Sequence, residues 1–200
     1  MYSYTCCAKI LVLALISLPS FACKMRKRGL MTDIPKTMAA IQFIERAHRG
    51  QFRKHSGLPY IVHCFNVYAI VKEYKESKNH DELGAISLLH DTLEDSVTTH
   101  AELTEIFGSM VADAVQELTN SKEKIKKMGK RAYMDEKLLT MSNYALMVKL
   151  ADMLANITDA ARFGILERIN HHIETLKSHR KLTDAQKKVV EHIETFLGKI

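Results

Sequence analysis

The chain of 200 residues contains no tryptophan, only three prolines and only eight glycines. Sandwiches and barrels of short strands need many Gly- and Pro-rich turns, so this composition argues against them. No stretch sustains the alternation of apolar and polar residues that marks a strand, and neither an internal repeat nor a Gly-rich phosphate loop is present. These absences favour a single all-α domain.

Cysteine is scarce outside the N-terminal segment. Three of the four cysteines lie at positions 6, 7 and 23, which leaves Cys64 alone in the rest of the chain. A single cysteine can form neither a disulfide framework nor a CxxC metal pair. The body of the chain is therefore suited to a reducing compartment.

No apolar run reaches the length of about 20 residues that a transmembrane helix needs. The longest run, residues 10–18, follows Lys9 and ends before Pro19, as in a signal peptide. Four basic residues come soon after it, and this asymmetry favours keeping the downstream chain in the cytoplasm. They are Lys24, Arg26, Lys27 and Arg28.

We therefore expect residues 1–30 to be an N-terminal extension, either signal-like or upstream of a working start at Met31. Residues 31–200 are expected to form the functional domain. A cytoplasmic protein is the primary expectation, with secretion or membrane anchoring through residues 1–23 as the alternative. No stable membrane partner is expected unless residues 10–22 act as an anchor.

The chain is basic, with a net charge of +6 at pH 7. Such a charge favours anionic partners but does not choose between nucleotides, nucleic acid and acidic lipid. Residues 121–131 are especially rich in lysine, which is typical of a solvated face or loop. We expect a small nucleotide as the partner and no nucleic acid. The oligomeric state stays open.

Apolar spacing and capping residues predict roughly eight to ten helices. The third of them, from about Glu82, is apolar over residues 85–89 and should be the most enclosed. Thr98 or Thr99, Ser109 and Thr183 are the expected N-terminal caps of later helices. Thr183 and Gln186 together form a predicted capping box.

The most informative stretch is residues 88–96, where an apolar run ends in a histidine, three carboxylates and two hydroxyls. On a continuous helix, His90 would stack over Glu94 and Asp91 over Asp95. Imidazole and carboxylate together suit a divalent first-row metal, and the second acidic pair can handle protons of a water molecule. The alternative is a polar helix end with an acidic cap.

Polar residues also interrupt the apolar helix expected over residues 144–161. Lys149, Asp152 and Asn156 share one stripe at spacings of three and four residues. A buried carboxylate must be paired or bound to metal. Asp152 is therefore either a metal ligand near anion-contacting groups or half of an internal ion pair with Lys149.

His63 lies in the second expected helix among apolar neighbours. Alone, it would be a hydrogen-bonded core histidine. With His90, Asp91 and Asp152 it completes a set of two histidines and two aspartates from three helices. Such mixed nitrogen and oxygen ligation suits Mn, Fe, Co, Zn or Ni.

Three motifs resemble the hydrolase domain of RelA/SpoT-type alarmone enzymes, which belong to the HD superfamily. Residues 47–63 match AHxGQxRKxSGxPYxxH, residues 88–95 match LLHDxxED, and residues 149–156 match KLADxxxN. Order and spacing are preserved over about residues 38–160. The chain has no room for the synthetase and regulatory domains of the long members, and is similar to the small stand-alone alarmone hydrolases.

The resemblance implies an HD-domain helical bundle that hydrolyses the 3′-pyrophosphate of (p)ppGpp to give GDP or GTP and pyrophosphate, using Mn²⁺. By motif position, the implied metal ligands are His63, His90, Asp91 and Asp152. The acidic pair at the catalytic water is Glu94 and Asp95, with Glu94 the better candidate for the general base. The implied substrate contacts are Arg53, Lys54, Lys149 and Asn156.

The chain departs from the family pattern at a few positions, and two other functions stay open. Cys64 replaces the proline that usually follows the ligand histidine, which can loosen His63 and places a thiol near the metal. One alternative is an HD phosphohydrolase acting on another phosphorylated nucleotide. The other is a non-catalytic protein that binds the alarmone, or that binds nucleic acid through its basic segment.

Overall fold

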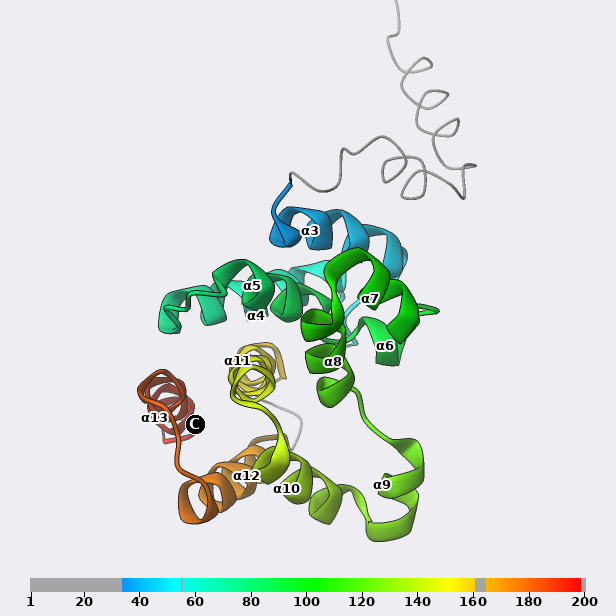
Figure 1. Ribbon diagram of the computed structural model, residues 1–200. Coiled ribbons are helices and arrows are strands. Elements are labelled where there is room, and N and C mark those ends of the chain that lie inside the picture. Colours follow the sequence, from blue (N-terminus) through cyan, green and yellow to red (C-terminus); the bar gives the residue numbers. More distant parts are fainter. Residues whose placement is uncertain (1–33, 55, 161–164, 199–200) are drawn as a thin grey trace, which may run out of the picture. The chain divides into compact units, whose positions relative to one another are not determined.

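The computed structural model describes residues 34–54, 56–160 and 165–198, with no account of the side chains at 158–160 (Figure 1). Residues Lys36–Ile200 form one compact unit, while the unit Met1–Pro35 lies almost wholly outside the described residues. The expectations for residues 1–30 therefore fall outside the description. None of the described helices has both the length and the hydropathy that a bilayer span requires.

The described chain is helical, which confirms the predicted all-α class. Its extended pairing is limited, within these residues, to one bridge between Phe52 and Pro59. The helices are α3 (Lys36–Ala47), α4 (Ile61–Tyr74), α5 (His80–Leu89), α6 (Thr92–Asp95), α7 (His100–Phe107), α8 (Ser109–Leu118), α9 (Lys122–Met128), α10 (Lys130–Thr140), α11 (Asn143–Ala160), α12 (Ile165–His179) and α13 (Asp184–Leu197).

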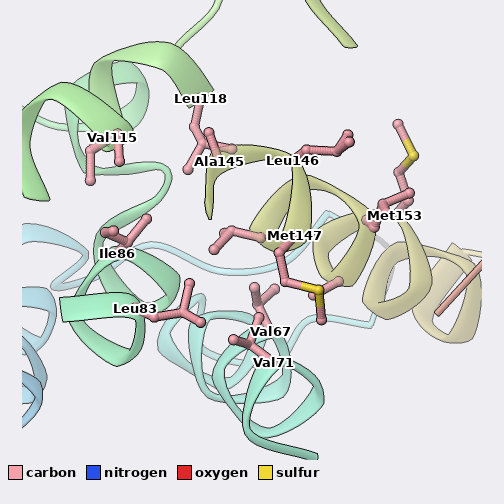
Figure 2. Close-up of a cluster of buried hydrophobic side chains, with 14 of the residues drawn as sticks. Val67, Val71, Leu83, Ile86, Val115, Leu118, Ala145, Leu146, Met147 and Met153 are labelled. Atoms are coloured by element: carbon pink, nitrogen blue, oxygen red, sulfur yellow. The ribbon is translucent and has the colours of Figure 1, made fainter. Parts of the chain in front are cut away.

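Two helices form the centre of the unit. Every residue of α5 from Leu83 to Leu89 is buried, as its apolar sequence predicts. Helix α11 packs against α4, α5, α8, α12 and α13, and is surrounded by them in Figure 1. Figure 2 shows part of the shared core, where Val67 of α4, Ile86 of α5 and Met147 of α11 meet.

The contact between α3 and α5 depends on two residues of α5. The Asp81 carboxylate accepts hydrogen bonds from the backbone N–H groups of Lys36 at 2.6 Å and Thr37 at 2.9 Å, and so caps the start of α3. A Cβ atom at Gly84 would lie 2.5 Å from Oγ1 of Thr37. Only glycine therefore allows α3 to approach so closely.

Most of the predicted helix ends are confirmed. Thr99 accepts a hydrogen bond from the N–H of Glu102, and Thr183 forms the expected capping box with Gln186. The prediction that Ser109 caps its helix is wrong, because Gly108 occupies the cap position at φ +87° and Ser109 is the first helical residue. Helix α9 carries much of the basic segment and buries none of its residues, in agreement with a solvated face.

Candidate metal centre

His90 is positioned by the end of α5. Its Nδ1 lies 2.8 Å from the backbone carbonyl oxygen of Ser87, which can only accept, so Nδ1 carries the proton. The Nε2 lone pair is then left for another partner. A carbonyl that fixes the tautomer in this way is typical of a metal-binding histidine.

His63 comes from the first turn of α4, two residues after the helix begins, and is as deeply buried as His90. Its Nε2 lies 3.2 Å from Oδ1 of Asp152 and 3.8 Å from Oδ2 of Asp91. The Nε2 of His90 lies 2.8 Å from the same Asp91 oxygen and 3.9 Å from the same Asp152 oxygen. Both imidazoles thus point at one pair of carboxylate oxygens.

The two Nε2 atoms are buried, and neither has a hydrogen-bond partner of acceptable geometry within the described residues. An unpaired buried nitrogen is costly, so two that converge on carboxylates call for a shared ligand. Ligand atoms of His63, His90 and Asp91 all lie within 4.8 Å of one another. Two imidazole nitrogens with carboxylate oxygens fit a divalent first-row cation.

Asp152 is held on both sides by neighbours on α11. Lys149 donates to Oδ2 at 2.8 Å and Asn156 donates to Oδ1 at 2.6 Å. Burial raises the pKa of the Asp152 carboxyl, but Lys149, His63 and His90 together outweigh burial and hold that pKa well below its usual range. The internal Lys149–Asp152 ion pair therefore exists, while Oδ1 still faces His63. The two interpretations of Asp152 are compatible.

The motif that contains His90 and Asp91 is not one continuous helix. Helix α5 ends at Leu89, His90 and Asp91 form a turn, and α6 begins at Thr92. The expected stacking of His90 over Glu94 on one helix is therefore wrong. The proximity of Asp91 and Asp95 is correct, because the hydroxyl of Tyr60 lies within 2.6 Å of the first carboxylate and 3.3 Å of the second.

Glu94 and Asp95 have different surroundings. Glu94 accepts hydrogen bonds from the backbone N–H of Asn120 at 3.1 Å and from its side-chain amide at 2.9 Å. Asp95 is exposed, yet partial desolvation together with the nearby Asp91 and Glu94 raises the pKa of its carboxyl. Asp95 therefore takes up a proton more readily than an ordinary aspartate, whereas Glu94 is held by the hydrogen bonds from Asn120.

The predicted substrate contacts fall in two groups. Arg53 reaches across to α11, where its Nη2 donates to Oδ1 of Asn156 at 2.7 Å. Lys149 and Asn156 line one pocket together with Asp152. Lys54 lies in the loop between α3 and α4 and is exposed. The structure therefore brings Arg53, Lys149 and Asn156 together and leaves Lys54 outside this group.

The pocket has a volume of about 200 Å³ and extends from Asp152, one of the candidate metal ligands, toward α10 and α12. Besides the three residues of α11, its polar lining includes Asn120, Lys130, Arg168 and His172. Lys130, Lys149 and Arg168 are basic, against a single carboxylate from Asp152. A polar, mainly cationic pocket beside a metal-ligand set can accept a phosphorylated molecule.

Sequence comparison places this arrangement in a known family. Residues 40–195 match the family model described as HD domain. The chain belongs to the HD domain family. Within the matched range lie all of the proposed ligands of this HD domain, His63, His90, Asp91 and Asp152.

Several relatives of this HD domain carry a hydrolase name. The Danio rerio protein named guanosine-3′,5′-bis(diphosphate) 3′-pyrophosphohydrolase MESH1 is 37% identical over 126 residues, which are 62% of this chain and 69% of that protein. The human protein of the same name is 36% identical over 132 residues, covering 66% of this chain and 73% of its own length. The Escherichia coli K12 bifunctional (p)ppGpp synthase/hydrolase SpoT is 30% identical, and the match spans only 22% of it.

A solved structure shares the fold of this HD domain. It is described as a metazoan ortholog of SpoT that hydrolyzes ppGpp and plays a role in starvation responses. The two structures superpose with a TM-score of 0.69 over 84% of this chain and 98% of the other. Their sequence identity is 23%, so the likeness supports the fold alone.

Three residues of the site were not predicted from the sequence. Tyr60 donates a hydrogen bond to Asp91 and belongs to the Pro-Tyr step, one helical turn before His63. Asn120 holds Glu94, and Lys137 donates to the Asn120 side chain at 3.0 Å. The position of Tyr60 within the first motif was a usable signal. Asn120 and Lys137 carry no local signal, because only the long-range hydrogen bonds of Lys137 to Leu118, Thr119 and Asn120 bring them together.

Proposed function

We propose that this HD domain is a metal-dependent hydrolase that removes the 3′-pyrophosphate of (p)ppGpp to give GDP or GTP and pyrophosphate. The observation that carries the proposal is the convergence of two buried, unpaired Nε2 atoms on the carboxylates of Asp91 and Asp152. The names of the relatives supply the substrate. The cationic pocket beside the ligand set suits a molecule with several phosphates.

The proposed reaction divides its tasks among named residues. His63, His90, Asp91 and Asp152 would hold a divalent cation, which supplies Lewis acidity that neutralises charge on the attacked phosphate. Glu94 accepts a proton from the attacking water, and Asp95, with its raised carboxyl pKa, can return a proton. Water oxygen ends on the pyrophosphate and the proton ends on the 3′-oxygen of the nucleotide, so atoms balance.

A separate group of polar side chains is proposed to bind the substrate. Arg53, Lys54, Lys149 and Asn156 are proposed to contact the nucleotide. Lys149 and Asn156 already line the pocket, while Arg53 is bonded to Asn156 and would share that amide with the substrate. A guanidinium and an ammonium group offer the charge-assisted hydrogen bonds that phosphate oxygens accept.

Manganese is the proposed ion, because two imidazoles and two carboxylates form a mixed donor set that Mn²⁺ tolerates well. The purified chain, stripped with a chelator, should release pyrophosphate from ppGpp only after a divalent cation is restored, and most rapidly with Mn²⁺. Faster turnover with Zn²⁺ or Mg²⁺ would refute the choice of ion. Release of phosphate from a different nucleotide, with none of the expected pyrophosphate from ppGpp, would refute the substrate.

A pair of histidine variants tests the ligand set. His90→Ala should lose both metal binding and hydrolysis, because it removes a buried ligand. His80→Ala is the matched control, since His80 is exposed at the other end of the same helix. Equal activity in the two variants would contradict the proposed site.

We further propose that residues 31–200 act as the hydrolase domain in the cytoplasm, on a small nucleotide and without nucleic acid or membrane partners. The cationic lining of the pocket and its volume of about 200 Å³ support a small phosphorylated ligand. Binding of RNA or DNA with a steep salt dependence, unchanged in His90→Ala, would contradict this proposal.

A further inference from the structure

One wall of the pocket is built by a part of the chain that none of the three motifs covers. Four residues of α12 line it, namely Ile165, Arg168, Ile169 and His172. Their spacing of three, four and seven residues puts them on one face of the helix. Lys130, the first residue of α10, lines the same pocket. Helices α10 and α12 lie side by side (Figure 1).

A partly buried hydrogen-bonded cluster fixes α12 against α10. The Asp135 carboxylate of α10 accepts from Nε2 of His171 at 2.9 Å and from Nδ1 of His172 at 2.8 Å. In the metal centre the histidine Nε2 atoms lack a well-formed hydrogen bond, whereas here each imidazole has one to its own carboxylate oxygen. This cluster therefore behaves as an anchor between helices, although its ligand atoms also lie within 4.8 Å of one another.

The anchor determines what His172 can offer to a ligand. Burial lowers the pKa of the His172 imidazole, and the two histidines lower the pKa of Asp135 despite its partial burial. A neutral imidazole that donates from Nδ1 presents Nε2 as an acceptor. In that neutral form His172 does not donate to a phosphate oxygen, so Arg168 and Lys130 are the anion-binding groups on this wall.

The other cations of the site already have partners. Lys149 is ion-paired with Asp152 and Arg53 is bonded to Asn156. Neither Arg168 nor Lys130 has a carboxylate partner within the described residues, and both side chains are exposed at the pocket. A guanidinium with two parallel N–H groups and a lysine ammonium group form a natural clamp for a phosphate chain.

We propose that Arg168 and Lys130 bind the 5′-phosphates of the substrate, the phosphate chain that the metal centre does not attack. Asp135 acts through His171 and His172 as a positioning residue for this wall. The inference rests on the proposed function, since it assumes a nucleotide with phosphates at both the 3′ and 5′ positions. Arg168 and Lys130 then determine how strongly the enzyme prefers substrates with a longer 5′ chain.

A substrate series tests the assignment. Guanosine 3′-diphosphates with one, two or three 5′-phosphates are hydrolysed by the unaltered, metal-loaded chain, and KM should fall as the 5′ chain lengthens. Arg168→Ala should raise KM for ppGpp about tenfold, the effect of losing one charge-assisted hydrogen bond, and should flatten the series. We expect kcat to stay within about twofold, because the lost contact is made equally in the ground and transition states. Lys130→Ala should act in the same direction.

Arg131→Ala is the matched control. Arg131 is exposed, follows Lys130 directly, and does not line the pocket, so the variant removes the same charge without touching the wall. Its KM should equal that of the unaltered chain across the series. If Arg168→Ala and Lys130→Ala keep the original KM values in an active enzyme, the proposed 5′-phosphate contacts are wrong. Failure of the unaltered chain to release pyrophosphate would refute the proposed function itself.

A measurement of metal binding tests separately whether Asp135 acts as an anchor between the helices. Equilibrium dialysis with Mn²⁺ should give one bound ion per chain, and His171→Ala should leave that number unchanged. Asp135→Asn should raise KM for ppGpp without loss of the bound ion. A second ion that disappears in His171→Ala would overturn the anchor assignment and identify the cluster as a metal site.

Discussion

The hydroxyl of Tyr60 donates a hydrogen bond of 2.6 Å to Oδ2 of Asp91, the oxygen that also lies 2.8 Å from Nε2 of His90. One carboxylate oxygen is thus shared by a proposed ligand histidine and a tyrosine from outside the ligand set. Burial and the neighbouring Asp91 raise the pKa of the Tyr60 hydroxyl, so it stays protonated and remains a donor. Tyr60 therefore orients Asp91 toward the ligand set.

Tyr60→Phe should weaken metal binding by about tenfold, the usual effect of removing a group that orients a metal ligand. Competition with a chelator of known affinity measures the change. Tyr68→Phe, on the helix that carries His63, is the control and should bind the ion as the unaltered chain does. Unchanged affinity in Tyr60→Phe would show that Asp91 needs no support from this hydroxyl.

Glu94→Gln should retain the metal ion and lose turnover by about 10²- to 10⁴-fold, because an amide cannot accept the proton that a general base must take. Metal stoichiometry and pyrophosphate release, measured on the same sample, separate the two effects. The control Glu73→Gln changes an exposed glutamate on α4. Hydrolysis at the original rate in Glu94→Gln would show that another residue is the general base.

The convergence of the four proposed metal ligands could be predicted because each of them sits in a recognisable local pattern. His63, His90 with Asp91, and Asp152 all interrupt apolar helical runs, and a buried polar residue in such a run requires a partner. The break in the helix at His90 was harder to predict from the sequence. Residues 88–95 have helical spacing throughout, and neither a proline nor a glycine marks the end of α5 at Leu89.

The wall of the pocket formed by α10 and α12 could not be predicted from the sequence. Helix α10 has a weakly patterned, charged sequence and was not predicted, although Tyr133, Met134 and Leu138 are buried. Its contact with α12 includes hydrogen bonds from two adjacent histidines, His171 and His172, to Asp135. Such long-range polar pairs leave no trace in local periodicity.

Gly84→Ala should destabilise the fold by about 2 kcal/mol, because its Cβ would lie 2.5 Å from Thr37 Oγ1 and force α3 away from α5. Urea denaturation measures the loss. Thr37→Ala in the same chain removes the clashing atom, so the double variant should be more stable than the sum of the single effects predicts. Strict additivity would show that the two helices separate for another reason.

Lys137→Met should also destabilise the fold, by about 3 kcal/mol, because it removes charged hydrogen bonds from buried acceptors. The Lys137 ammonium group donates to the carbonyl oxygens of Leu118 at 2.7 Å and Thr119 at 2.8 Å, and to the Asn120 side chain at 3.0 Å. Since Asn120 holds Glu94, the variant should lower kcat as well. Lys177→Met, an exposed change on α12, is the control for stability.

The stability difference between the unaltered chain and Lys137→Met should widen as pH rises. Burial lowers the pKa of Lys137 to about 8 in the folded chain, whereas a free lysine titrates near about 10.4. Between these values the unfolded chain binds more protons than the folded chain, so this residue's contribution to the free energy of unfolding increases with pH. Below about pH 8 both states are protonated and the difference should be constant. Urea denaturation of both proteins at pH 7, 8 and 9.5 measures it, and a difference that narrows toward high pH would mean that burial does not control this lysine.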